Sequence, residues 1–161
     1  MGNGWFKCSA ELSLNATGAY VYLINSATQG WNTAYQGDGV SGILVWGAQL
    51  TASAKALPYV KTLDVAVTKT FAETLRTEYD ATTGENLGAL IEGGSTNLCT
   101  YSEDFSNAAW NKSGLTSTAN AIIAPDGTLS GDLITITVGG GHVLGQAITV
   151  IASTQYAFSF Y

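Results

Sequence analysis

Charged side chains are scarce in this chain of 161 residues, of which only 11% are Asp, Glu, Lys or Arg. The six Lys and Arg are scattered along the sequence. Nucleic-acid binding needs clustered cations that displace counterions from phosphates, so the sequence argues against a nucleic-acid partner. The formal net charge of −6 is better explained as keeping a surface of low charge soluble.

Long apolar runs are also missing. No stretch approaches the roughly 20 consecutive apolar residues that a membrane-spanning helix needs. The opening residues MGNGW have neither the basic start nor the apolar run of a signal peptide. We therefore expect no membrane insertion and no secretion signal.

Reactive residues are few. Cys8 and Cys99 lie far apart, so they are either one disulfide or, as we favour, two small apolar residues buried in strands. The single histidine, His142, follows three glycines and is expected at the surface, and no nucleophile elbow or Cys–His pair is recognisable. Residues 37–42 match GxGxxG, but a polar loop precedes them and a strand pattern follows, which predicts a turn. We expect no enzymatic activity.

Strand patterns dominate what is present. Residues 5–14 alternate, with Phe6, Cys8, Ala10, Leu12 and Leu14 on one face, which predicts a half-buried strand. Residues 42–50 (GILVWGAQL) predict one strand covered on both faces. The other predicted strands cover residues 19–24, 116–123, 129–138, 142–150 and 154–161, and Pro125-Asp126-Gly127 marks the turn between the second and third of these.

The middle of the chain differs in composition, because ten of the eighteen charges lie between Lys55 and Glu92. A solvated linker is one interpretation. The other is a small hairpin packed beside the main group of strands, with extended residues 75–80, a turn at 80–85 (DATTGE) and a second strand in NLGALIE.

Two phrases carry a family resemblance. Residues 37–50 read GDGVSGILVWGAQL and residues 97–114 read NLCTYSEDFSNAAWNKSG. Both resemble parts of the carbohydrate-binding-like β-sandwich modules of bacteriophage tail and virion proteins. In those modules the YSEDFSNAAW phrase opens the domain and the WGAQL phrase closes it, whereas here the closing phrase comes first.

The resemblance implies an all-β fold, a jelly-roll-like antiparallel β-sandwich. Residues 1–57 would supply closing strands, 58–94 a charged linker or hairpin, and 95–161 opening strands. The halves would fold together as a permuted module, or each would be completed by strand exchange between subunits. Unpaired edges left by missing strands would favour such exchange.

The same resemblance implies a function. We expect a non-enzymatic phage or prophage virion protein, such as a tail fibre or capsid decoration module. It would act by assembly with itself or other virion proteins and by attachment to a surface or cell-surface glycan. Two alternatives are a secreted, extracellular carbohydrate-binding module of a bacterial glycoside hydrolase and an architectural subunit with no ligand.

A polar loop supplies the expected glycan site. Trp31 and Tyr35 lie there with Asn32 and Gln36, and an aromatic face beside amides is a common way to hold a sugar ring. The alternative is that Trp31 folds back as a loop anchor.

Four acids were considered as metal ligands: Glu103, Asp104, Asp126 and Asp132. Nothing in the sequence places a pair of them as glycosidase carboxylates, so surface charge is the simpler interpretation. They are also candidates for a structural Ca²⁺, which prefers carboxylate and carbonyl oxygens. Trp46, however, stands where related calcium-binding modules tend to have Asp.

Overall fold

The chain is all-β. The computed structural model describes residues 4–14, 18–22, 37–69, 76–79, 86–90, 94–137 and 142–161, and every regular element within them is a strand. None of these residues forms a helix with the length and hydropathy needed to span a bilayer. The strands are β1 (Cys8–Leu14), β2 (Gly18–Tyr22), β3 (Gly42–Val45), β4 (Gln49–Thr51), β5 (Val67–Lys69), β6 (Arg76–Tyr79), β7 (Asn86–Leu90), β8 (Ser95–Asn97), β9 (Asn111–Ser113), β10 (Leu115–Ile123), β11 (Leu129–Ile136), β12 (Val143–Ala147) and β13 (Thr154–Phe160).

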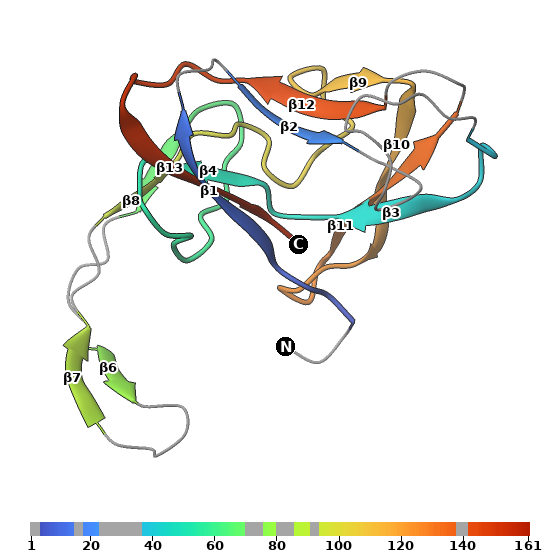
Figure 1. The fold of residues 1–161 in the computed structure, drawn as a ribbon. Coiled ribbons are helices and arrows are strands. Elements are labelled where there is room, and N and C mark those ends of the chain that lie inside the picture. Colours follow the sequence, from blue (N-terminus) through green and yellow to red (C-terminus); the bar gives the residue numbers. More distant parts are fainter. Residues whose placement is uncertain are drawn as a thin grey trace, which may run out of the picture.

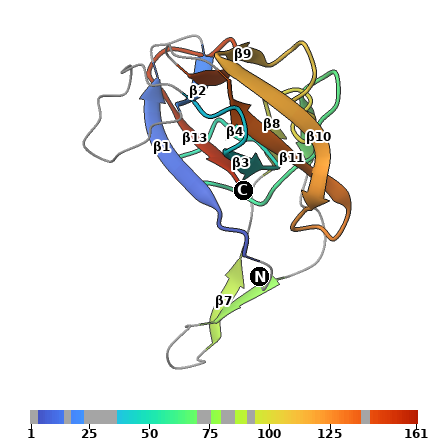
Figure 2. The same cartoon turned by 90° about the vertical axis from the view of Figure 1, so that its right-hand side faces the viewer.

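The strands form small antiparallel sheets. Three have three strands, in the orders β1–β13–β4, β10–β11–β3 and β2–β12–β9, and β5–β8 and β6–β7 are pairs. Figure 1 shows β2, β12 and β9 along the top of the molecule, with β13, β4, β11 and β3 beneath them. Figure 2, a quarter turn away, again places β2 and β9 at the top.

One hydrophobic core lies between these sheets. Leu144 of β12 is buried in the same cluster as Leu50 of β4, Ile134 of β11, and Tyr156 and Phe158 of β13. The early and late parts of the chain therefore share one interior. The jelly-roll connectivity stays a prediction.

The four strands predicted between residues 116 and 161 are confirmed as β10, β11, β12 and β13. The turn before β11 follows the expected Pro125-Asp126-Gly127 signal: Gly127 has φ +86° and its N–H donates to the Ala124 carbonyl at 2.9 Å. The predicted hairpin is present as β6–β7, but both views show it projecting away from the other strands rather than packed beside them.

The strand at residues 42–50 was wrongly predicted as continuous. β3 and β4 belong to different sheets, and Gly47 between them has φ +66°, a left-handed conformation that glycine adopts readily. Next to this break, the backbone N–H and C=O groups of Trp46 form two hydrogen bonds of 2.8 Å with those of Tyr161. Double coverage is also wrong for β3, because Gly42, Ile43 and Leu44 are exposed.

The strand at residues 5–14 is present as β1, but less of it is buried than predicted. Phe6 is 79% exposed, Cys8 and Ala10 are also exposed, and Leu12 packs against the core; the side chain of Leu14 lies outside what the structure describes. β1 lies at the edge of its sheet, so its apolar face extends past the interior. Cys8 is therefore not the buried residue we expected, whereas Cys99 is buried, and both thiols are free.

Asn97 joins the two motif-bearing stretches within one chain. Its side chain is fully buried, and its Oδ1 accepts hydrogen bonds from the backbone N–H groups of Leu50 and Cys99, both at 3.1 Å. Its Nδ2 donates to the carbonyls of Ala48 at 3.0 Å and Val60 at 2.8 Å. Both amide protons and the amide oxygen are thus used, which fixes the WGAQL strand against the start of the NLCTYSEDF phrase.

Candidate functional site

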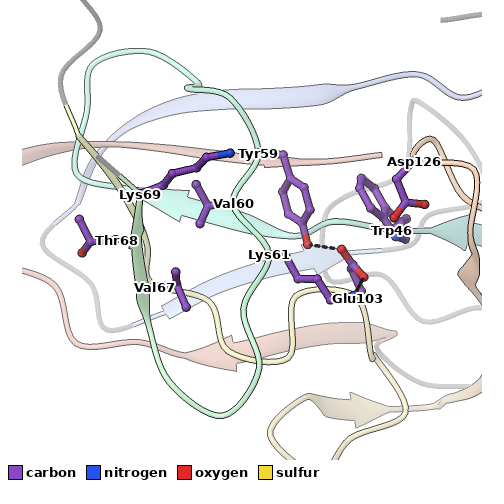
Figure 3. Close-up of a pocket in the computed structure, with 9 residues that line it drawn as sticks. All are labelled: Trp46, Tyr59, Val60, Lys61, Val67, Thr68, Lys69, Glu103 and Asp126. Carbon is purple, nitrogen blue, oxygen red and sulfur yellow. Dashed lines mark hydrogen bonds and ion pairs between the residues drawn. The ribbon is translucent and has the colours of Figure 1, made fainter. Parts of the chain in front are cut away.

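A hollow of about 450 Å³ lies where four separate segments meet. They are the break between β3 and β4, the chain from residue 59 through β5, the turn within YSEDF and the Pro125–Gly127 turn before β11. Figure 3 shows side chains from each of these segments around the hollow. Its lining consists of Trp46, Tyr59, Val60, Lys61, Val67, Thr68, Lys69, Glu103 and Asp126.

Aromatic rings form one wall. The ring centroids of Trp46 and Tyr59 are 4.6 Å apart with planes at 53°, and Tyr161 meets Trp46 edge-on at 5.6 Å. Gly47 lets the chain bend under these rings, and a Cβ added there would lie 3.4 Å from the Tyr59 ring. Trp46 is 4% exposed, so Tyr59, which is half-buried, is the ring better placed to meet a ligand.

A buried carboxylate anchors the second wall. Glu103 is only 8% exposed and its Oε2 forms an ion pair with Lys61 Nζ. Tyr59 Oη donates to Glu103 Oε1 at 3.1 Å and lies 2.6 Å from Ser102 Oγ. Burial raises the pKa of Tyr59 well above its usual value, so the phenol stays protonated and remains a donor.

Asp126 is held above Trp46 by a chain of hydroxyl groups. Trp46 Nε1 donates to Ser130 Oγ at 2.9 Å, Ser130 Oγ lies 2.8 Å from Thr128 Oγ1, and Thr128 Oγ1 donates to Asp126 Oδ1 at 2.7 Å. Slight desolvation raises the pKa of Asp126, but the Thr128 hydrogen bonds and the charge of Lys61 outweigh it, so the pKa is lowered overall. Asp126 is therefore an ionised acceptor at the rim.

The residues predicted for glycan binding, Trp31, Asn32, Tyr35 and Gln36, lie outside the described residues. The predicted metal ligands are described and they separate. Glu103 and Asp126 line the hollow, while Asp104 and Asp132 belong to the fold.

Asp132 binds the backbone. It is 1% exposed, its Oδ2 accepts the N–H of Phe105 at 2.8 Å, and its Oδ1 accepts the N–H of Asn120 at 2.9 Å. Asn120 has φ +54° within a register shift of β10, so this carboxylate ties the YSEDF turn to an irregular part of the strand. Burial raises the pKa of Asp132.

Asp104 caps its own turn, because its Oδ1 accepts hydrogen bonds from Ser106 and Asn107. Within the described ranges no group of three or more His, Cys, Asp and Glu residues gathers as a metal site would. The structure therefore places the four acids at separate positions, and each accepts hydrogen bonds from protein donors.

The GxGxxG match folds as the turn that we predicted. Asp38 Oδ1 accepts the N–H groups of Val40 at 2.9 Å and Ser41 at 2.6 Å, and the Ser41 hydroxyl also binds this carboxylate. Hydrogen bonds from Ser41 lower the pKa of Asp38 to about 2. His142 is buried rather than at the surface, with Nδ1 3.3 Å from the Gly114 carbonyl oxygen.

Sequence reasoning missed Tyr59 and Lys61, because they lie in the segment that composition marks as a charged linker. A signal was present: residues 59–62 alternate, with Val60 and Thr62 buried and Lys61 exposed between them. Gln49 fixes this segment, since its Oε1 accepts the Val60 N–H at 2.7 Å. The alternation over residues 59–62 is too short to be separated from linker sequence by periodicity.

The hollow combines a flat ring, a neutral donor, two carboxylates and two lysines, which suits a small polar ligand with both hydroxyl groups and an apolar face. A scan against protein-family models and searches of curated proteins and of solved structures returned no match.

Proposed function

We propose that this protein is a non-enzymatic structural module of a phage or prophage virion, part of a tail fibre, capsid decoration or similar appendage. It acts by assembly and by attachment to a surface glycan. The observation that carries the proposal is the interlocking of the two motif phrases. Asn97, Ala48 and Ser102 join them by buried hydrogen bonds, including Ala48 N–H to the Ser102 carbonyl at 2.8 Å.

This interlocking supports the proposal because the resemblance lies in those phrases. A module of this kind needs both phrases to contribute side chains to one hydrophobic interior. The order of the halves is reversed along the chain, yet their side chains still meet, as a permuted module requires.

The aromatic hollow supports the attachment part. Stacking of a sugar ring on Tyr59, with its hydroxyls bonded to Asp126 and Lys69 at the rim, uses groups that line one hollow of suitable size. Glu103 and Lys61 neutralise each other, so the wall that they form suits a ligand of low charge.

A glycan array followed by titration of the best ligand tests attachment. Tyr59→Leu removes the flat ring, and we expect at least about a tenfold loss of affinity. Lys69→Ala should weaken binding, while Lys55→Ala, an exposed lysine that does not line the hollow, is the matched control. Binding that is unchanged in Tyr59→Leu would reject the hollow as the attachment site.

Assembly is tested separately, by the mass of the purified chain in solution and by electron microscopy of its particles. Higher-order particles without any glycan binding would favour the purely architectural role. A monomer that binds glycans would favour the carbohydrate-binding module of a hydrolase.

A further inference from the structure

β1 is an edge strand with a self-complementary sequence. Among the described strands it pairs only with β13, and residues 6–12 read FKCSAEL. We propose that this edge pairs antiparallel with β1 of a second copy, with Ser9 facing its own counterpart on a two-fold axis. This pairing gives the self-assembly proposed above, on which it rests, a defined interface.

Charge selects the register. With Ser9 on the axis, Lys7 of each copy faces Glu11 of the other, and both residues are exposed and share one face of the strand. Opposite charges that face each other across strands are stabilising, and like charges are destabilising. Moving either copy by two residues removes both ion pairs, because Lys7 then faces Ser9 in one direction and Ser13 in the other.

Apolar residues favour the same register. On the other face, Phe6 meets Leu12 of the second copy and Cys8 meets Ala10. This face also carries Tyr156, Phe158 and Phe160, the β13 partners of Leu12, Ala10 and Cys8. In one copy alone the apolar face ends uncovered, with Phe6 79% exposed. A slip by one residue would set the apolar face of one copy beside the polar face of the other.

The existing contacts of Lys7 are compatible with the proposed pairing. Lys7 Nζ donates to the Leu57 carbonyl at 3.3 Å and lies 5.9 Å from the centre of the Tyr161 ring. An ammonium group has three protons, so Lys7 can keep this bond and still reach a carboxylate. A hollow of about 230 Å³ beside Phe6 and Cys8, with Leu44 and Ile122 in its lining, continues the apolar surface.

Charges on an edge strand normally prevent pairing between copies. In the proposed antiparallel register, however, Lys7 and Glu11 of opposite copies attract each other. Stable interfaces bury about 1,200 Å² or more, and pairing over residues 6–12 alone buries less surface than that. We therefore expect a weak dimer, which covalent trapping by a disulfide detects best.

Disulfide trapping tests the register. Directly opposed residues in an antiparallel pair have Cα atoms roughly 4.5–5.5 Å apart, within the range that a disulfide bridges. We expect Ser9→Cys in a Cys8→Ser background to form a covalent dimer under mild oxidation, and faster than the native chain with its own Cys8. Ala109→Cys in the same background is the control, because residue 109 is exposed but distant along the fold. Cys99 is 1% exposed and does not compete.

Charge reversal tests the ion pairs. Lys7→Glu or Glu11→Lys alone should lower the rate of Ser9→Cys trapping about 10- to 30-fold, since two attractive pairs become repulsive. The double variant Lys7→Glu/Glu11→Lys should restore trapping to near its original rate. A fold defect would not be repaired by the second reversal, so restoration distinguishes pairing from misfolding.

The outcomes separate this interface from assembly in general. Trapping at Ser9→Cys that is lost and restored by the reversals supports the interface. Faster trapping through native Cys8, or trapping that ignores the reversals, overturns the register. Larger particles without Ser9→Cys trapping overturn the interface and leave the proposed assembly intact. A chain that is monomeric at all concentrations and never trapped overturns both.

Discussion

The junction at Asn97 and the edge at β1 treat side chains in opposite ways. At the junction, the buried side chains of Asn97 and Asp132 find hydrogen-bond partners within the same chain. Asn97 bonds to backbone groups of four other residues. Asp132 bonds to backbone groups of two others. At the edge, apolar residues of the core-facing side reach the surface without cover. The junction is therefore complete within one chain, whereas the edge leaves apolar surface exposed.

The largest effect should come from the junction. Replacing Asn97 with Leu, of similar volume, leaves the N–H groups of Leu50 and Cys99 and two carbonyls buried without partners. We expect a loss of about 3–5 kcal/mol in the free energy of unfolding. Urea denaturation measures it, and Asn111→Ala, at an exposed position on β9, should stay within about 0.5 kcal/mol. Equal effects of the two variants would mean that the junction does not hold the halves together.

Asp132→Asn should cost less than the Asn97 replacement, about 1–3 kcal/mol, because one of two backbone donors loses its acceptor. The loss should depend on pH. Burial raises the folded-state pKa of Asp132 above 3.8, so its favourable contribution is complete below that value and falls as pH rises through the folded pKa. The stability of the wild type should therefore fall as pH rises through the folded pKa, and the variant, whose amide does not titrate, should lack this fall.

Asp38 provides the contrast at an exposed turn. Its folded pKa is lowered to about 2, so its contribution is present above 3.8 and is lost as pH falls toward 2. Asp38→Asn should thus remove stability near neutral pH and make no difference in strong acid. The same pH trend for both variants would contradict the assigned environments.

Gly47→Ala should have an intermediate effect. Its φ of +66° costs a side-chain-bearing residue roughly 1–2 kcal/mol, and the added methyl also lies against Tyr59. Gly39→Ala is matched in conformation, with φ +72° and no atom within 4 Å. We expect similar losses of stability in both, with a changed tyrosine near-ultraviolet signal in Gly47→Ala alone.

Phe6→Ser should have the smallest effect on one copy, within about 0.5 kcal/mol, because the ring is mostly in solvent. Phe158→Ala, on the same face of the neighbouring strand but buried, should cost about 3–5 kcal/mol. If thermal denaturation of dilute protein shows that Phe6→Ser is also strongly destabilising, the edge is covered within the single chain.

Local signals in the sequence predicted most of the strands. Alternation and the Pro125-Asp126-Gly127 turn identified β10 to β13, since both depend on neighbours in the chain. The break at Gly47 was missed, because the adjoining apolar residues look the same whether one sheet or two receive them. The exposure of Phe6 and Cys8 depends on which strand lies beside β1, and pairing partners are far apart in sequence.

The candidate site was harder to predict for the same reason. Tyr59, Glu103 and Asp126 come from three distant segments and gather only through tertiary packing. Each looked ordinary alone: Tyr59 in a supposed linker and the two acids as surface charge. Composition indicates the residue types, but it does not show that these three side chains line the same hollow.

The pairing of β5 with β8 has a consequence for how this chain could vary. Lys69 and Ser95 face each other across that pair, so everything between them departs from and returns to adjacent points of the body. A change in the length of this segment, or its replacement by a tight turn, therefore keeps its two ends at adjacent positions. We expect the strand registers of the body to tolerate such changes.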